Sequence, residues 1–178
     1  MKDAQAQRRF AEVVVPHLDD AYGLARWLTG SSADAEDIVQ EAAIRAFRAI
    51  AGFSDGNPRA WTLAIVRNCA FTWLAKNRPK AMVFTDDLEA AERSGIEALG
   101  PPETTTAEGE MIARQDATRL GAAIGALPIV YREVLVLREM QGLAYREIAA
   151  VLAVPMGTVM SRLARARDLL IAALREDE

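Results

Sequence analysis

The residues best suited to chemistry lie at 156–167, where arginines and small polar side chains alternate with apolar ones at helical spacing. At 100° per residue the apolar positions form one stripe: Val159, Leu163, Ala166 and Leu170. The opposite face and its flanks carry Gly157, Thr158, Met160, Ser161, Arg162, Ala164 and Arg165. Small side chains allow close approach to DNA, and arginines and hydroxyls donate to phosphates and base edges. The pattern favours a DNA-contacting helix, and the plainer alternative is a solvated arginine face on a helical hairpin.

Two short helices are expected around this face. Apolar periodicity predicts helices at Tyr145–Leu152 and Met156–Ala173, joined by a tight break. A second helix that carries the donors is typical of a helix-turn-helix. Ala113–Ala126 and Ile129–Glu139 are predicted as the helices that support it, with Ile148, Leu152 and Leu135 as anchors.

The first half of the chain also shows helical spacing throughout. The pattern predicts a helix over 10–28 with a break near Pro16, and a second helix that starts at an N-cap, Ser32. Pro58 suits the first turn of a third helix, which runs to about Lys76 after a loop at 52–58. The core face of the second helix is expected to comprise Ala35, Ile38, Val39, Ala42, Ala46, Phe47 and Ile50. No strand alternation occurs, so the predicted fold class is all-α, with two small helical domains.

The charge of the chain is concentrated in its middle. The net charge is −4, but residues 85–110 hold eight acidic residues and one arginine, a balance of −7. The remaining 20 basic and 17 acidic residues give +3, which suits flanking parts that meet nucleic acid. Glycine, proline and threonine interrupt the acidic stretch, which predicts a flexible linker with at most one short helix at 86–98.

Composition argues against several classes of protein. Cys69 and His17 are the only residues of their types, so an internal disulfide is impossible and a zinc site is not expected. Neither a phosphate-binding glycine loop nor a nucleophile–base pair occurs, so we expect no catalytic residues, no metal and no cofactor. The sequence also shows no signal peptide and no apolar run of about 20 residues, which predicts a cytoplasmic protein without membrane insertion.

Three motifs in order resemble a known family. The stretches Leu127-Pro128…Tyr131-Arg132-Glu133 and Gly157-Thr158-Val159-Met160-Ser161-Arg162-Leu163 resemble the C-terminal domain of extracytoplasmic-function (ECF) sigma factors of bacterial RNA polymerase. Ala35-Glu36-Asp37-Ile38-Val39-Gln40-Glu41 resembles the polymerase-docking helix of that family. Pro58-Arg59-Ala60-Trp61…Ile65-Val66-Arg67-Asn68 resembles its promoter-melting helix.

The resemblance implies a role for each motif. The polymerase-binding residues, facing the clamp of the largest subunit, would be Asp37, Gln40 and Glu41. Recognition and opening of the −10 element would use Asn57, Arg59, Trp61, Arg67 and Asn68. Recognition of the −35 element would use Gly157, Thr158, Met160, Ser161, Arg162, Ala164 and Arg165. Whether Trp61 stacks on DNA or belongs to the core stays open at this stage.

The resemblance also implies partners and boundaries. It predicts an N-terminal domain at 1–80, an acidic linker at 81–110 and a C-terminal helix-turn-helix domain at 111–178. Core RNA polymerase, promoter DNA and an anti-sigma factor would be the partners. The alternatives are a sigma-mimicking regulator that only sequesters an anti-sigma protein, and a stand-alone repressor.

Three departures from the family pattern stand out. Ala153 occupies a turn position where glycine is frequent, and Ala144 replaces a frequent N-cap serine or threonine. Each is expected to cost about 1 kcal/mol of stability. Met160 stands where many relatives have a basic residue, which bears on the −35 sequence that is recognised.

Overall fold

The structure is a computed structural model, and it describes residues 2–79 and 107–176. Over these residues the secondary structure is helical, as the sequence predicts. The first half contains α1 (Lys2–Val13), a 3-10 turn at Val15–His17, α2 (Leu18–Thr29), α3 (Ser32–Ala49), a 3-10 turn at Ile50–Gly52 and α4 (Pro58–Asn77). The second half contains α5 (Ala107–Ala126), α6 (Ile129–Leu135), a π-helical turn at Val136–Met140, α7 (Tyr145–Leu152) and α8 (Met156–Glu176).

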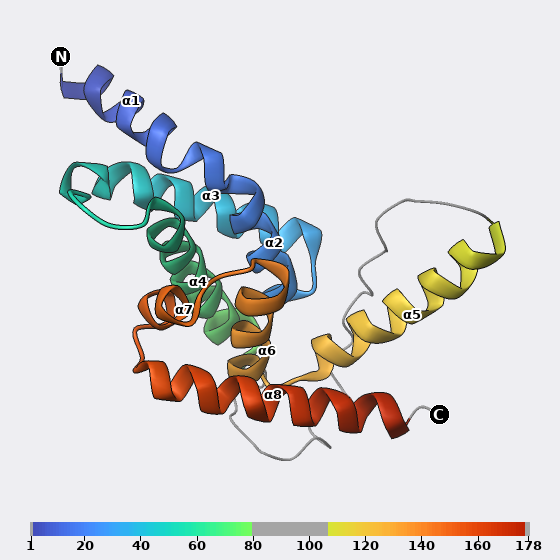
Figure 1. The fold of residues 1–178 in the computed structure, drawn as a ribbon. Helices are drawn as coiled ribbons and strands as arrows, with labels where there is room; N and C mark the ends of the chain where they lie inside the picture. The colour runs from blue at the N-terminus through green and yellow to red at the C-terminus, as the bar shows by residue number, and fades with distance from the viewer. Residues whose placement is uncertain (1, 80–106, 177–178) are drawn as a thin grey trace.

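Helices α2, α3 and α4 pack closely together and form the body of the first half (Figure 1). Small buried residues such as Ala21, Ala25 and Ala42 let the helix axes approach one another. Helix α2 ends at Gly30, whose φ of 72° is the left-handed conformation that glycine adopts readily. The N-cap of α3 is Ser31, whose hydroxyl accepts from the Asp34 amide, so the predicted cap at Ser32 was wrong by one residue.

A smaller core cluster lies where α1 meets the end of α3. Val14, Ala46 and Ile50 are buried there, as the periodicity predicted for the last two. Phe47 was expected in the core but is 40% exposed. Its ring packs edge-on against Phe10 of α1 at the surface, with 5.6 Å between ring centroids.

The second half departs from its predicted helices in two places. Helix α5 begins at Ala107, earlier than the predicted Ala113, and extends away from the rest of the molecule (Figure 1). The helix expected at 129–139 turns π-helical at Val136–Met140, where the Gln141 amide donates to the Val136 carbonyl at 3.0 Å. The π-helical turn overlaps the end of a run of five successive buried residues, at 133–137, two of which it contains.

The turn between α7 and α8 has helix-turn-helix geometry. The two helices are bent by 101° relative to one another. Ala153 has a φ of 53°, as its position suggested, and the Val154 amide donates to the Ala149 carbonyl at 3.1 Å. Ala144 offers no side-chain cap to α7, but the Glu147 carboxylate accepts from the Ala144 amide at 2.7 Å. That bond satisfies the capping residue's own amide and leaves the first-turn amides of the helix without a side-chain acceptor.

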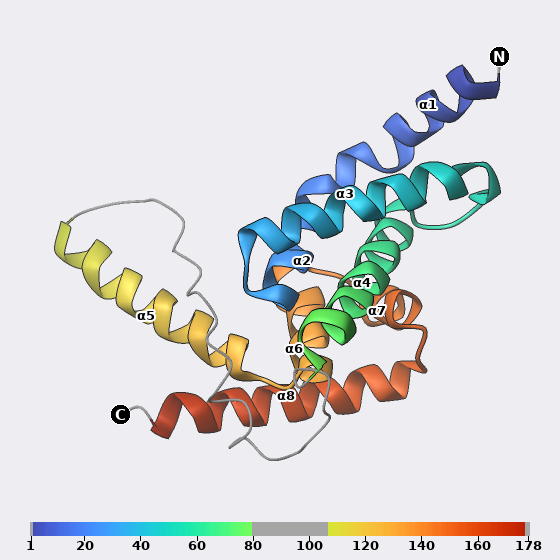
Figure 2. The ribbon, with the colours of Figure 1, turned by 180° about the vertical axis from the view of Figure 1, so that it is seen from behind.

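The two halves of the chain share one core. A single cluster of buried side chains runs from α2, α3 and α4 into α6, α7 and α8. Helix α4 packs on α7, and α2 packs on α6 (Figure 2). The all-α prediction with two helical regions is confirmed, and the structure adds that these regions are in contact. The predicted linker helix at 86–98 lies outside the described residues, and the predicted domain boundaries remain a prediction.

Within the described ranges, no individual helix is both long and apolar enough to cross a membrane. Only the sharply bent pair α7 and α8 reaches that length and composition when the two are taken together.

Candidate nucleic-acid interface

The proposed polymerase-docking residues lie in one row on α3. Asp37, Gln40 and Glu41 are all exposed, because Ile38 and Ala42 turn the opposite side of the helix into the core. Glu41 accepts from the Arg45 guanidinium at 2.7 Å, an exposed pair one helical turn apart. Beside this row, α3 and α4 border a hollow of about 330 Å³ that Asp37 and Glu41 help to line. The row is a polar, solvent-facing surface.

The proposed −35 residues form the outer face of α8. Val159, Leu163 and Ala166 are fully buried, as the predicted stripe requires, and Leu170 is partly buried. The opposite side is exposed at Gly157, Met160, Ser161, Ala164 and Arg165. Thr158 and Arg162 lie at the edge and are partly buried. Five of the seven predicted contacts therefore share one exposed face of one helix and two lie at its edge, an arrangement that suits entry into a major groove.

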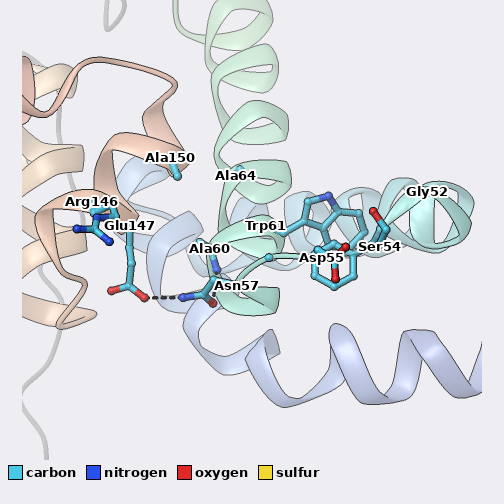
Figure 3. A pocket seen from close by; sticks show the side chains of 12 residues that line it. Gly52, Ser54, Asp55, Asn57, Ala60, Trp61, Ala64, Arg146, Glu147 and Ala150 are labelled. Atoms are coloured by element: carbon cyan, nitrogen blue, oxygen red, sulfur yellow. Dashed lines mark hydrogen bonds between the residues drawn. The ribbon is translucent and has the colours of Figure 1, made fainter.

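The proposed −10 residues begin at the loop before α4. Asn57 is the N-cap of α4, where its Oδ1 accepts from the Arg59 and Ala60 amides at 2.9 and 3.2 Å. The Asn57 amide group also donates to the Glu147 carboxylate of α7. Figure 3 shows this bond at one end of a pocket of about 500 Å³ between the loop and α7. Asn57 thus has a structural role in addition to any contact with a base.

Trp61 lies at the boundary between core and surface. Its ring packs against Phe53, with 4.9 Å between centroids, and it is partly buried in the smaller core cluster. The same indole lines the 500 Å³ pocket (Figure 3). One part of Trp61 therefore packs inside and another part faces the pocket, and its stacking on DNA stays a prediction.

The two predicted −10 arginines both contact the second half of the chain. Arg59 donates to Asp20 at 2.6 Å and to the Gln141 carbonyl at 2.6 Å. Arg67 donates to both carboxylate oxygens of Glu133, at 2.8 and 3.2 Å, and lies 4.1 Å above the Phe71 ring. Asn68 is exposed beside it.

Glu133 is the residue that sequence reasoning missed. It is completely buried, and Arg162 of α8 also reaches its Oε1 at 3.5 Å. Burial raises the pKa of Glu133, while the hydrogen bond and charge of Arg67 and the charge of Arg162 oppose that rise. The sequence contained a signal for this burial, because Glu133 lies four residues after Ile129 and four before Leu137, both of which are buried. Helical spacing therefore placed its carboxylate on the core face.

A further arginine, Arg132, joins the two halves at the C-terminal end of α2. Arg132 donates to the Trp27 and Leu28 carbonyls at 3.4 Å and to the Leu127 carbonyl at 2.9 Å. Burial, together with the charge of Arg78, lowers the pKa of Arg132 to about 10. A positive group at a helix C-terminus is favourable, so Arg132 ties α6 to α2.

An all-α chain with an exposed polar row on α3, a polar loop-helix unit and an arginine-bearing helix-turn-helix fits the class of sigma-70 factors. Sigma-70 region 2 matches residues 13–79, and sigma-70 region 4 matches residues 117–170. The chain belongs to the ECF sigma factor family within that class.

Relatives of known name and solved structures also resemble this chain over most of its length. The ECF RNA polymerase sigma factor SigE of Mycolicibacterium smegmatis is 33% identical over 94% of this chain, which spans 62% of that relative. The ECF RNA polymerase sigma-E factor of Escherichia coli K12 is 36% identical over 78% of this chain and 73% of its own length. CnrH, solved with the cytosolic domain of CnrY, has a TM-score of 0.66 at 28% identity over 99% of this chain and 96% of its own.

A further solved structure shares the fold. The sigma factor RpoE of Bartonella quintana, in complex with the anti-sigma factor NepR, gives a TM-score of 0.70 at 24% identity. The alignment covers 95% of this chain and 98% of that one. Both structural neighbours match nearly the whole chain, so the similarity extends across both halves.

Proposed function

We propose that this chain binds core RNA polymerase, directs it to promoters and helps to open the DNA there. Region 2 would supply docking through Asp37, Gln40 and Glu41, and −10 recognition through the loop and α4. Region 4 would read the −35 element with the outer face of α8. The observation that carries the proposal is the exposed face of α8, which holds five of the seven predicted −35 residues and has the other two, Thr158 and Arg162, at its edge.

The same chemistry assigns different tasks to the two DNA faces. The exposed face of α8 offers Arg165 and hydroxyl groups beside small residues, which suits double-stranded major-groove contact. The loop and α4 offer the Trp61 indole and the Asn57 amide at a pocket, which suits a base removed from its stack. The chain acts by binding alone in this proposal, with no catalytic residue, metal or cofactor of its own. A polymerase partner places its work in the cytoplasm.

An anti-sigma factor is the proposed regulator. CnrH, 28% identical to this chain, was solved with the cytosolic domain of CnrY. An equivalent inhibitor here would cover the exposed α3 row and the DNA faces together.

Docking is tested by co-elution with sigma-free core polymerase. The double variant Asp37→Ala with Glu41→Ala is expected to lose most co-elution, since two of the three docking side chains are removed. Glu12→Ala with Asp19→Ala is the matched control, because both residues are exposed acids on other helices. Equal co-elution of the two double variants would overturn the docking assignment. Failure of the unaltered chain to co-elute while it still binds DNA would favour a stand-alone repressor.

A further inference from the structure

One edge of the exposed face of α8 is apolar. Met156, Met160 and Ala164 are all exposed and follow one another at intervals of four residues. Residues four apart are neighbours on a helix surface, so the three lie in a line along successive turns. Each of the two methionines is 52% exposed. We call these three residues the apolar row.

The apolar row is separate from the core side of the helix. Val159, Leu163 and Ala166 are fully buried and hold α8 against the rest of the molecule. In both views of the ribbon α8 runs along the lower edge of the molecule (Figures 1 and 2). A single exposed apolar residue is common on a protein surface. A line of three, on the helix face that also carries DNA donors, suggests a bound apolar group instead.

The other edge of the same face is polar. At 100° per residue, Ser161 and Arg165 lie about 100° and 140° around the helix from Met160. Both are exposed, and the Ser161 hydroxyl donates to the Thr158 carbonyl at 3.1 Å, which leaves its lone pairs available to a donor. The face of α8 is therefore divided lengthwise into an apolar half and a polar half.

The major groove of DNA offers the same two chemistries. Guanine presents acceptors that arginine binds, and the C5-methyl of thymine is the apolar group that base pairs present there. The N-terminal residues of a recognition helix reach the base edges, and Met156 and Met160 belong to the first two turns of α8. The unbranched thioether side chain adapts to small irregular surfaces, which suits contact with a methyl group.

We propose that the apolar row recognises thymine in the −35 element through its C5-methyl group. The proposal rests on the function proposed above, since it takes α8 as the −35 helix, and it adds Met156 to the residues predicted there. The exposed Arg165 and Ser161 beside the row favour DNA over a protein as its occupant. At position 160, where many relatives have a basic residue, this chain replaces a hydrogen bond by a methyl contact.

Replacement of thymine by uracil tests the contact, because uracil lacks the C5-methyl group and keeps the base-pairing edge. The full chain with sigma-free core polymerase is titrated against the promoter upstream of the chain's own gene. One duplex has thymine throughout, and the other has uracil at every thymine of the −35 element, located from the transcript start. The uracil duplex is expected to bind roughly fourfold more weakly for each methyl that is contacted.

Variants of the row assign the effect to its side chains. Met160→Ala should weaken binding to the thymine duplex roughly fourfold and leave binding to the uracil duplex unchanged, since the two changes remove the same contact. Met160→Leu keeps an apolar side chain of similar size and should retain most of the thymine preference. Met140→Ala is the matched control, because Met140 is 46% exposed and precedes the helix-turn-helix, and it should retain the full preference. Circular dichroism verifies that each variant keeps its helix content.

The outcomes separate this contact from the proposed function. Equal affinity of the unaltered complex for the two duplexes overturns the thymine contact, and so does a −35 element without thymine on either strand. A loss in Met160→Ala that is equal on both duplexes assigns the side chain to the support of α8, and full thymine preference in Met160→Ala leaves the row to a protein partner. Either result overturns the proposal. If the unaltered chain gives polymerase no affinity for promoter DNA, the proposed function fails, and the thymine contact fails with it.

Discussion

The two proposed DNA faces differ in what lies across from them. Arg165 on α8 faces solvent, whereas Arg67 on α4 faces a buried carboxylate from the other half. Both are arginines within helices, so residue type does not explain the difference. The packing of α4 against the second half explains it, because Arg67 lies at that seam beside Glu133 of α6 and Arg165 lies on the exposed side of α8. An identical side chain is therefore available in one region and occupied in the other.

The largest expected effect comes from removing a buried side chain that supports the exposed face of α8. Leu163→Ala deletes a fully buried side chain beneath the exposed α8 surface and should lower the free energy of unfolding by about 2–5 kcal/mol. Ile171→Ala, at a position 49% exposed on the same helix, is the control and should change little. Thermal or urea unfolding measures both. Equal stability of the two variants would show that α8 does not depend on its buried stripe.

An intermediate effect is expected from arginine removal, and it should differ between the faces. Arg165→Ala should weaken promoter binding by about 1–3 kcal/mol without changing compactness, because Arg165 is exposed and forms no hydrogen bond or ion pair with the residues that the structure describes. Arg67→Ala should reduce strand opening and also raise the radius of gyration, since it removes one of the two arginines that contact Glu133. Fluorescence anisotropy on promoter DNA and solution scattering measure the two responses. Expansion in both variants, or in neither, would remove the distinction.

The smallest expected effect concerns the turn between α7 and α8, which sets the direction of the exposed face of α8. Ala153→Gly should stabilise the chain by about 1 kcal/mol, because glycine adopts a φ of 53° without the side-chain strain of alanine. Ala172→Gly, in the exposed part of α8, should instead lose about 1 kcal/mol. Denaturant midpoints compare the two. A loss of stability in Ala153→Gly would mean that the left-handed turn is not strained.

The sequence predicted the features that follow from the periodicity of a single helix. The stripe of Val159, Leu163 and Ala166 follows from a 100° rotation per residue, and so does the exposed row at Asp37 and Glu41. The family resemblance also marked Ala153 as a turn position where glycine is frequent, and its φ is 53°.

What escaped prediction depends on contacts between distant segments. Arg67 and Glu133 are 66 positions apart, and Asn57 and Glu147 are 90 positions apart. Periodicity placed Glu133 on a buried face but contained no information about which cation would meet it there. The π-helical turn at Val136–Met140 was missed for a related reason, since it adjusts a helix to neighbours on both sides.

The central claim is that this chain gives core RNA polymerase its promoter specificity through two separate DNA faces. Run-off transcription with sigma-free core polymerase, on the promoter upstream of the chain's own gene, tests it most directly. The account predicts a discrete transcript that requires the chain and falls with either Arg67→Ala or Arg165→Ala. A transcript of equal intensity without the chain, or no transcript despite stable co-elution with polymerase, would contradict it.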